Sequence, residues 1–235
     1  MSALRKLLPT FALFALVAHA GNPLAQDPAT APGTGNFNTS WAGFPRCLAA
    51  RQKAFDATKA KDKGAVVFLG DSLTEGAPLV KLFPGIRTAN RGVSGDTTRG
   101  MLCRLEDNVL DLAPKAVVVL GGTNDMMQPG GDAAKTAENL KSIVAGIRAK
   151  FPAVRVFVLK TPPNSKQGPA FVKTWNTALD KTLGTLPGCT LVDLYTPFVK
   201  ADGTLDAEVF RDGTHFKPEG YERYKKTLAP LLARL

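Results

Sequence analysis

Five short, largely apolar segments constrain the fold of this chain more than any other feature. They are GAVVFLG (64–70), the weaker IRTAN (86–90), KAVVVLGG (115–122), VRVFVLK (154–160) and CTLVDL (189–194). Their apolar residues run continuously and do not alternate with polar ones, which is typical of strands buried on both faces. Segments with helical apolar periodicity separate them. This alternation predicts an α/β fold, a three-layer α/β/α sandwich around a five-stranded parallel sheet.

The helices between these strands are predicted from the same periodicity. They span 44–63, 96–112, 132–151, 171–183 and 217–235. Asp96 and Asp132 stand where an aspartate would cap the second and third of these helices. We expect one domain over residues 41–235, without an internal repeat or a second domain.

The first 20 residues have the three parts of an export signal. Arg5 and Lys6 form a basic start, residues 7–18 are largely apolar, and Ala18-His19-Ala20 supplies the small residues that signal peptidase accepts. An uncut membrane anchor is the alternative, but the apolar run is shorter than the about 20 residues that a bilayer span needs. We expect a signal peptide at 1–20 and an exported protein, periplasmic or secreted.

Composition narrows the class of protein further. Residues 21–40 are rich in Pro, Gly, Ala and Thr, which favours a flexible lead-in. The formal net charge is +10, but no aromatic-interleaved basic cluster indicates a nucleic-acid partner. A weak attraction to anionic cell-envelope surfaces is one interpretation of this charge, and a generally basic soluble surface is the one we favour. Cys47, Cys103 and Cys189 lack metal-ligand spacing, so we expect small core residues, with at most one bridge, and no metal site.

Glycine and polar residues gather where the predicted strands end. The first strand leads into GDSLT (70–74), the second into NRGVSGD (90–96), the third into GGTND (121–125) and the fifth, after a loop, into DGTH (212–215). The carboxyl ends of parallel strands share one edge of the sheet, where ligands bind. Each motif alone is consistent with an ordinary turn. Together they supply the parts of an acyl-transfer site.

The chemistry of such a site depends on a single imidazole. The chain has two histidines, and His19 lies in the predicted signal peptide, which leaves His215. A serine hydroxyl needs a base to act as a nucleophile, and Ser72 is the candidate nucleophile for His215 to activate. Asp212, three residues before His215, is placed to fix the tautomer of the ring.

Attack on an ester creates an oxyanion that needs hydrogen-bond donors already in position. The backbone N–H groups of Ser72 and Gly95 and the side-chain amide of Asn124 are the candidate donors. Ser72, Asp212 and His215 are thus the candidate catalytic residues, and Ser72, Gly95 and Asn124 the candidate oxyanion hole.

The four motifs resemble, in the same order, the four sequence blocks of the SGNH (GDSL) hydrolases across residues 64–235. All five candidate residues fall on the corresponding family positions. The resemblance implies a flavodoxin-like fold and ester hydrolysis without a metal or an organic cofactor. NRGVSGDTTRGMLCRL and VVVLGGTND look closest to the branch containing the catalytic subunits of platelet-activating-factor acetylhydrolase and related bacterial esterases. That branch tends to remove short acyl groups such as acetate.

The remaining acidic and aromatic residues near the motifs have simpler interpretations. Asp71 and Asp125 suggest a carboxylate pair or a metal site, but loop bracing through backbone N–H groups is the favoured reading. Trp41 and Trp175 suggest a sugar site, but packing is the commoner role of each.

The sequence therefore predicts a serine esterase that hydrolyses short-chain esters, with a small-molecule or glycan ester as substrate. Expected pocket walls are Leu73–Pro84, Met126–Gly131 and the loop 161–170. Lysophospholipids or acyl-thioesters are the second substrate class. An O-acyltransferase that passes the acyl group to a glycan, and a glycan-binding module without turnover, are the alternatives from other functional classes.

Overall fold

The computed structural model describes Asn38 and residues 41–235, so the predicted signal peptide and nearly all of the predicted lead-in lie outside the described residues. The elements, in chain order, are α1 (Phe44–Asp62), β1 (Val66–Gly70), α2 (Ser72–Glu75), α3 (Leu79–Leu82), β2 (Thr88–Gly92), α4 (Thr98–Cys103), α5 (Leu105–Asn108), η3 (Leu110–Leu112), β3 (Ala116–Leu120), α6 (Ala133–Lys150), β4 (Arg155–Leu159), α7 (Pro169–Leu183), β5 (Cys189–Val192), η4 (Thr196–Phe198), η5 (Ala207–Val209) and α8 (Pro218–Leu232).

The five strands form one parallel sheet in the order β2-β1-β3-β4-β5. Gly70, at the end of β1, pairs with Gly92 of β2 on one side and with Leu120 of β3 on the other. These three strands therefore end level with one another. The strand order reverses at β1, and in open α/β sheets the crevice at such a reversal is where ligands bind.

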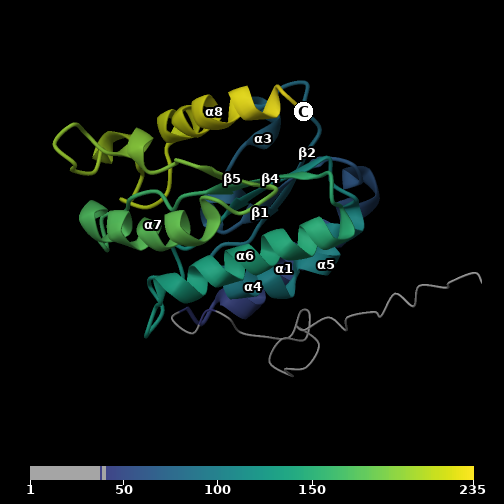
Figure 1. The fold of residues 1–235 in the computed structure, drawn as a ribbon, viewed down its shortest axis with the longest axis horizontal. Helices are drawn as coiled ribbons and strands as arrows, with labels where there is room; N and C mark the ends of the chain where they lie inside the picture. The colour runs from purple at the N-terminus through teal and green to yellow at the C-terminus, as the bar shows by residue number, and fades with distance from the viewer. Residues whose placement is uncertain (1–37, 39–40) are drawn as a thin grey trace, which may run out of the picture.

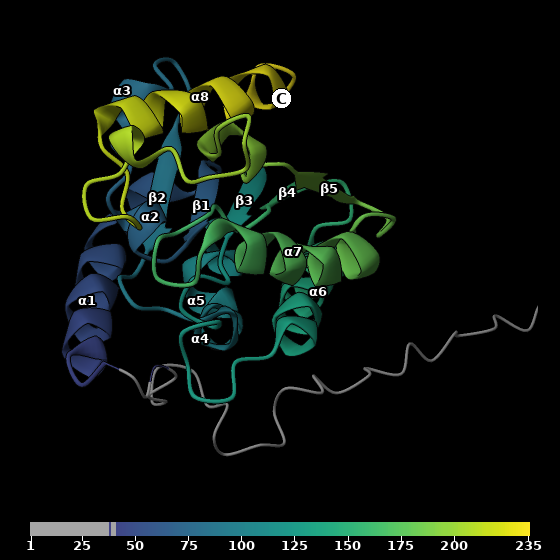
Figure 2. The same cartoon turned by 90° about the vertical axis from the view of Figure 1, so that its left-hand side faces the viewer.

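Helices cover both faces of the sheet, as Figures 1 and 2 show, with α8 and α3 on one side and α4, α5, α6 and α7 on the other. Alternate strand residues point to opposite faces. Val67 and Leu69 of β1 join the core beneath α4–α7, whereas Val66 and Phe68 join the core beneath α3 and α8. The three-layer α/β/α sandwich predicted from the apolar strand segments is confirmed.

Helix α1 packs beside the edge strand β2. Its Phe44 and Phe55 form a small cluster with Val93, which follows β2. Arg91 of β2 is only 2% exposed, and it forms an ion pair with Asp62 (2.9 Å) while its guanidinium lies 4.8 Å from the ring centroid of Phe55. The N-terminal helix thus covers the segment that leads from β2 into the candidate site.

The helix predicted over 96–112 is broken in the structure into α4, α5 and the single turn η3. Its N-cap is Thr97, whose hydroxyl accepts from the Gly100 N–H (3.3 Å), so the predicted cap at Asp96 is wrong. Arg104 leaves helical geometry (φ −99°, ψ 13°) between α4 and α5. By contrast Asp132 caps α6, as predicted, by accepting from the N–H groups of Ala134 and Lys135.

None of the three cysteines forms a disulfide bridge, and each is half-buried. Cys47 packs against the α1 cluster and Cys189 against the core beneath α7, which agrees with their reading as small packing residues. Within residues 41–235, no helix is both long and apolar enough to cross a membrane.

Candidate active site

Ser72 is the first residue of α2, and Asp71 alone separates it from the end of β1. The turn between strand and helix is tight: a Cβ on Gly70 would lie 2.1 Å from Thr74 Oγ1 and 2.7 Å from the Leu120 carbonyl oxygen. Only glycine fits there. Asp71 caps the helix by accepting from the Leu73 N–H (2.9 Å), and this bond sets the direction of the turn that carries Ser72.

His215 reaches Ser72 from the other end of the chain. Its Nε2 lies 2.9 Å from Ser72 Oγ, and its Nδ1 lies 2.8 Å from Asp212 Oδ2. The other carboxylate oxygen of Asp212 accepts from the backbone N–H groups of Thr214 (3.1 Å) and His215 (2.8 Å). The structure therefore joins all three predicted catalytic residues in one hydrogen-bonded chain.

The electrostatics of Asp212 determine which ring nitrogen carries the proton. Partial desolvation would raise the pKa of Asp212, but hydrogen bonds from the backbone and ring of His215 and from Thr214 outweigh it and lower the pKa to about 2. An ionised carboxylate only accepts hydrogen bonds. Nδ1 of His215 is thus the donor to Asp212, and Nε2 is left as the acceptor for the Ser72 hydroxyl.

A cluster of aromatic rings supports the loop that carries His215. Phe210 and Phe216 pair across an isolated antiparallel bridge, and both rings contact Phe198 of η4. After the bridge, α8 begins at Pro218, and its Tyr221 hydroxyl donates to the Leu73 carbonyl (3.0 Å). This bond ties α8 to α2, the helix that begins with Ser72.

The two remaining predicted donors lie on the neighbouring loops. Gly95, with φ +81°, follows β2, and Asn124 follows β3. Asn124 Nδ2 donates to the carbonyl of Asp96 (3.0 Å), the residue after Gly95, and Val93 N–H donates to the Gly70 carbonyl (3.0 Å). The structure thus joins the loops of Gly95 and Asn124 and fastens the loop after β2 to the end of β1, two residues before Ser72.

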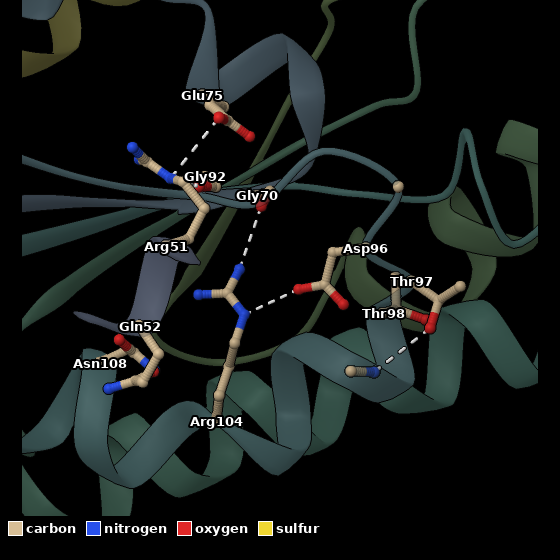
Figure 3. A network of polar contacts seen from close by, with 12 residues as sticks. Arg51, Gln52, Gly70, Glu75, Gly92, Asp96, Thr97, Thr98, Arg104 and Asn108 are labelled. Atoms are coloured by element: carbon tan, nitrogen blue, oxygen red, sulfur yellow. Dashed lines mark hydrogen bonds and ion pairs between the residues drawn. The ribbon is translucent and has the colours of Figure 1, made fainter. Parts of the chain in front are cut away.

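Arg104 links the turn after β2 to the end of β1, a role that the sequence did not indicate. Its Nε donates to Asp96 Oδ2 (2.7 Å) and its Nη2 donates to the Gly70 carbonyl (3.1 Å), as Figure 3 shows. Both side chains are buried, so the ion pair is shielded from water. Arg104 therefore holds the end of β1 at a fixed distance from the turn after β2.

Glu75 at the end of α2 and Arg51 of α1 hold the same turn. Glu75 Oε2 accepts from the backbone N–H (2.6 Å) and hydroxyl (2.8 Å) of Ser94. Arg51 Nε donates to the Gly92 carbonyl (2.9 Å) and lies 3.7 Å from Glu75, as Figure 3 also shows. The turn between Gly92 and Asp96 is thus braced on two sides.

Three aspartates are clustered beneath the site. Burial raises the pKa of Asp71 to about 7, and it raises that of Asp96 to about 6 although Arg104 opposes the shift. Burial also raises the pKa of Asp125, against hydrogen bonds from the Thr98 backbone and hydroxyl. The predicted bracing role of Asp71 and Asp125 through backbone N–H groups is confirmed. Among residues 41–235, no cluster of three or more His, Cys, Asp or Glu side chains could hold a metal.

Some residues of the expected pocket walls, and one of the two tryptophans, are buried. Met126 is 6% exposed, and its sulfur accepts from Asn164 (3.7 Å). Trp175 is 5% exposed and belongs to the core beneath α7, so its packing reading is confirmed. Trp41 differs, because it is 41% exposed and lies against Gly95.

Asn38 makes a buried contact near the candidate site that the sequence did not predict. It falls in the segment predicted to be a flexible lead-in, yet it is 3% exposed and donates to the Gly95 carbonyl (2.7 Å). Asn38 is one of three asparagines in a stretch rich in Pro, Gly, Ala and Thr, and no periodicity or motif would have singled it out.

This chain is similar in sequence to known proteins. Residues 68–223 match the model of the GDSL-like Lipase/Acylhydrolase family. Platelet-activating factor acetylhydrolase IB subunit alpha2 of Rattus norvegicus is 32% identical over 184 residues, which cover 74% of this chain and 79% of that protein.

Solved structures share the fold. A GDSL-like lipase from Bacteroides thetaiotaomicron superposes with a TM-score of 0.68 at 23% identity, covering 79% of this chain and 98% of its own. The acetyl xylan esterase AlAXEase superposes with a TM-score of 0.61 at 18% identity, covering 71% and 98%.

Proposed function

Because this chain belongs to the GDSL-like lipase/acylhydrolase family, we propose that it is a serine esterase that hydrolyses short-chain carboxylic esters through an acyl-Ser72 intermediate. The observation that carries the proposal is the hydrogen-bonded chain from Ser72 through His215 to Asp212. A nucleophile, a base and a group that orients the base are the parts that acyl transfer requires.

In the first half of the reaction, Ser72 Oγ attacks the acyl carbonyl carbon as His215 Nε2 takes the hydroxyl proton. The Asp212 carboxylate stabilises the imidazolium that results. The carbonyl oxygen, now an oxyanion, accepts from the Ser72 and Gly95 N–H groups and the Asn124 amide. The intermediate collapses as the bond to the alcohol oxygen breaks, and the alcohol leaves with the proton from His215.

In the second half, water replaces the alcohol. His215 Nε2 takes a proton from the water as its oxygen attacks the acyl carbon, and the same donors hold the oxyanion. The bond to Ser72 Oγ then breaks, Ser72 regains its proton from His215, and the carboxylic acid is released.

Two observations support a short acyl group. Leu73 and Met126, both in segments expected to line the pocket, are 1% and 6% exposed, so a long chain would have to displace side chains that are already close-packed. The names of the rat relative and of AlAXEase both describe enzymes that remove an acetyl group. We propose an acetyl ester of a small molecule or a glycan as the substrate class.

Hydrolysis of p-nitrophenyl esters from acetyl to dodecanoyl tests this proposal. We expect kcat/KM to be highest at acetyl or butyryl and to fall steeply beyond, with Ser72→Ala below detection and Ser142→Ala, on the remote helix α6, unchanged. Activity that rises with chain length would point instead to lysophospholipids or thioesters. No Ser72-dependent hydrolysis of any ester would contradict the esterase assignment and favour a transferase or a glycan-binding role.

The proposed cellular location of the enzyme rests on the first 20 residues. We propose that the enzyme is exported and acts in the periplasm or outside the cell, because the basic start, apolar run and Ala18-His19-Ala20 site form a complete export signal. N-terminal sequencing of the protein recovered from cell fractions is the test. A mature chain that begins at Gly21 in the exported fraction is expected, and an uncut cytoplasmic chain would contradict export.

A further inference from the structure

The turn that carries Gly95 is held by a residue far outside the part of the chain that matches the family model. The match begins at residue 68, whereas Asn38 donates from Nδ2 to the Gly95 carbonyl oxygen at 2.7 Å. Asn38 is 3% exposed, so this hydrogen bond is shielded from competing water. An N-terminal segment therefore reaches one of the two loops that carry the oxyanion donors.

The same asparagine is connected to the second donor loop. Gln128 Nε2 donates to Asn38 Oδ1 (3.0 Å) and also lies within hydrogen-bond distance of the Asn124 carbonyl oxygen (3.3 Å). A continuous relay thus runs from Gly95 through Asn38 and Gln128 to Asn124. We call Asn38 and Gln128 the amide bridge. It spans the loops after β2 and β3, which carry the two donors.

Trp41 provides an independent contact between the N-terminal segment and the Gly95 turn. A Cβ on Gly95 would lie 2.5 Å from Trp41 Cε3, and a Cβ on Gly43 would lie 2.8 Å from Trp41 Cε2. The indole occupies the space that side chains at these two glycines would fill. Trp41 is therefore packed against the turn to which Asn38 is hydrogen-bonded.

The amide bridge matters because a glycine with positive φ is easily reoriented. The Val93–Ser94 peptide group, which precedes the one that carries the Gly95 N–H, is anchored because the Ser94 N–H donates to Glu75. The peptide after it is anchored at both ends: Asp96 N–H donates to the Val93 carbonyl (3.0 Å), and the Gly95 carbonyl accepts from Asn38. Loss of the Asn38 side chain would remove one of these hydrogen bonds and let the backbone at Gly95 rotate. The Gly95 N–H would then turn away from the oxyanion.

We propose that Asn38 and Gln128 are positioning residues that hold the Gly95 N–H and the Asn124 amide at the separation that the oxyanion requires. This inference rests on the proposed serine-esterase function. Neither residue touches the reacting atoms. Both act on the transition state through the groups they hold, so their loss lowers kcat and leaves substrate binding nearly unchanged.

Steady-state kinetics on p-nitrophenyl acetate with Asn38→Ala, Gln128→Ala and the double variant test the bridge. We expect each single variant to lose about 10- to 100-fold in kcat, with KM changed by less than about threefold. The double variant should lose no more than the worse single one, because both substitutions break the same relay. Asn38→Asp, which keeps the acceptor but not the donor to Gly95, should behave like Asn38→Ala.

Affinity for ethylboronic acid gives a second measurement. It would not change if Asn38 and Gln128 only supported the fold. Its tetrahedral adduct with Ser72 places a negative oxygen in the oxyanion hole, so its affinity should weaken by the same factor as kcat. Gln52→Ala is the matched control: the Gln52 amide, like that of Asn38, accepts one hydrogen bond, from Asn108, and donates another, to the Asp56 carboxylate. It lies on α1 (Figure 3), and its loss should leave kcat and boronate affinity unchanged.

The outcomes separate this inference from the function on which it rests. Wild-type protein without Ser72-dependent turnover and without a boronate adduct would remove both proposals. A working wild-type enzyme whose Asn38→Ala and Gln128→Ala variants keep kcat and boronate affinity would overturn the amide bridge alone, as would strictly additive losses in the double variant. Should Asn38→Ala fail to fold, Gln128→Ala decides, because Gln128 is only half-buried.

Discussion

The carboxylate of Asp212 accepts hydrogen bonds from both the ring and the backbone of His215: Oδ2 from Nδ1 (2.8 Å) and Oδ1 from the amide N–H (2.8 Å). One side chain therefore shapes the turn and orients the base within it. These two roles are separable by substitution, because asparagine keeps the Oδ1 acceptor and replaces Oδ2 with a donor.

Asp212→Asn should lower kcat by about 100- to 10,000-fold while leaving the fold intact. The new amide N–H would face Nδ1 and force the ring proton onto Nε2, which then cannot accept the Ser72 proton. Asp212→Ala should lose activity similarly and also lower Tm by a few degrees, because the turn loses its Oδ1 acceptor. Ester hydrolysis and thermal unfolding of both variants check this. Equal Tm losses in the two would contradict the separation of roles.

Gly213 lies in the same turn with φ +76°, and a Cβ there would fall 2.0 Å from Ser165 Oγ. Ser165 also donates from its backbone N–H to the Gly213 carbonyl (2.9 Å). Gly213→Ala should therefore displace the turn from the loop 161–170 and reduce kcat at least tenfold, with a loss of stability above the about 1–2 kcal/mol that positive φ alone costs.

Gly203→Ala is the control for that prediction. Gly203 also has positive φ (+81°), but a Cβ there would meet nothing within 4 Å. Its substitution should cost about 1–2 kcal/mol in unfolding free energy and leave kcat unchanged. Chemical denaturation and kinetics on both variants compare strain with clash. Matching effects at the two positions would show that Ser165 does not support the catalytic turn.

The sheet and four of the five predicted helices agree with the structure because their signals are local. Continuous apolar segments such as residues 116–120 specify buried strands, and Asp132 marks the start of α6 with a cap that needs no tertiary partner. The approach of Ser72 to His215 followed from the same reasoning, since the carboxyl ends of parallel strands share an edge. The motifs then identified which residues on that edge to pair.

The break in the helix predicted over 96–112 could not be predicted, because side-chain contacts of Arg104 override the helical periodicity of the segment. Arg104 leaves helical geometry where its side chain reaches Asp96, at the start of the same segment, and the Gly70 carbonyl at the end of β1. Asn38 was missed for the same reason: its contacts with Gly95 and Gln128 join residues 57 and 90 positions away. Neither contact leaves a periodic trace in the sequence.

The buried pair of Arg104 and Asp96 should be far more sensitive than a surface pair. Arg104→Met would leave Asp96 buried without its partner, and we expect a loss of about 3–5 kcal/mol in unfolding free energy near pH 8. The loss should shrink near pH 5, because the pKa of Asp96 is raised even with Arg104 present, and a neutral carboxyl needs no partner.

Urea denaturation of Arg104→Met at both pH values checks this expectation. The double variant Asp96→Asn/Arg104→Met should regain at least half of the loss at pH 8, because the unpaired charge is gone. Lys141→Met removes an exposed pair with Glu138 (3.3 Å) and should change stability by less than about 0.5 kcal/mol. A loss that is the same at pH 5 and pH 8 would contradict the buried-charge explanation.

The stability of the fold should fall as pH rises from about 4 to about 7, because of Asp71, which immediately precedes Ser72. Burial raises the pKa of Asp71 from 3.8 to about 7, so the folded state binds its proton more tightly than the unfolded state does. The contribution is complete below about pH 4 and is lost as pH passes about 7. The two pKa values set its size at on the order of 4 kcal/mol.

Asp71→Asn should flatten this pH dependence while keeping the helix cap, since asparagine retains an oxygen that accepts from the Leu73 N–H. Asp96 shifts in the same direction, so part of the slope will remain. Urea denaturation at pH 5, 6, 7 and 8 gives the comparison, with Asp132→Asn at the exposed cap of α6 as the matched charge change. If Asp71→Asn is no flatter than Asp132→Asn, Asp71 is ionised in the fold at neutral pH. If it is flatter, and gains stability over wild type towards pH 8, the carboxyl beside Ser72 takes up a proton in the folded protein as pH falls from 8 to 5.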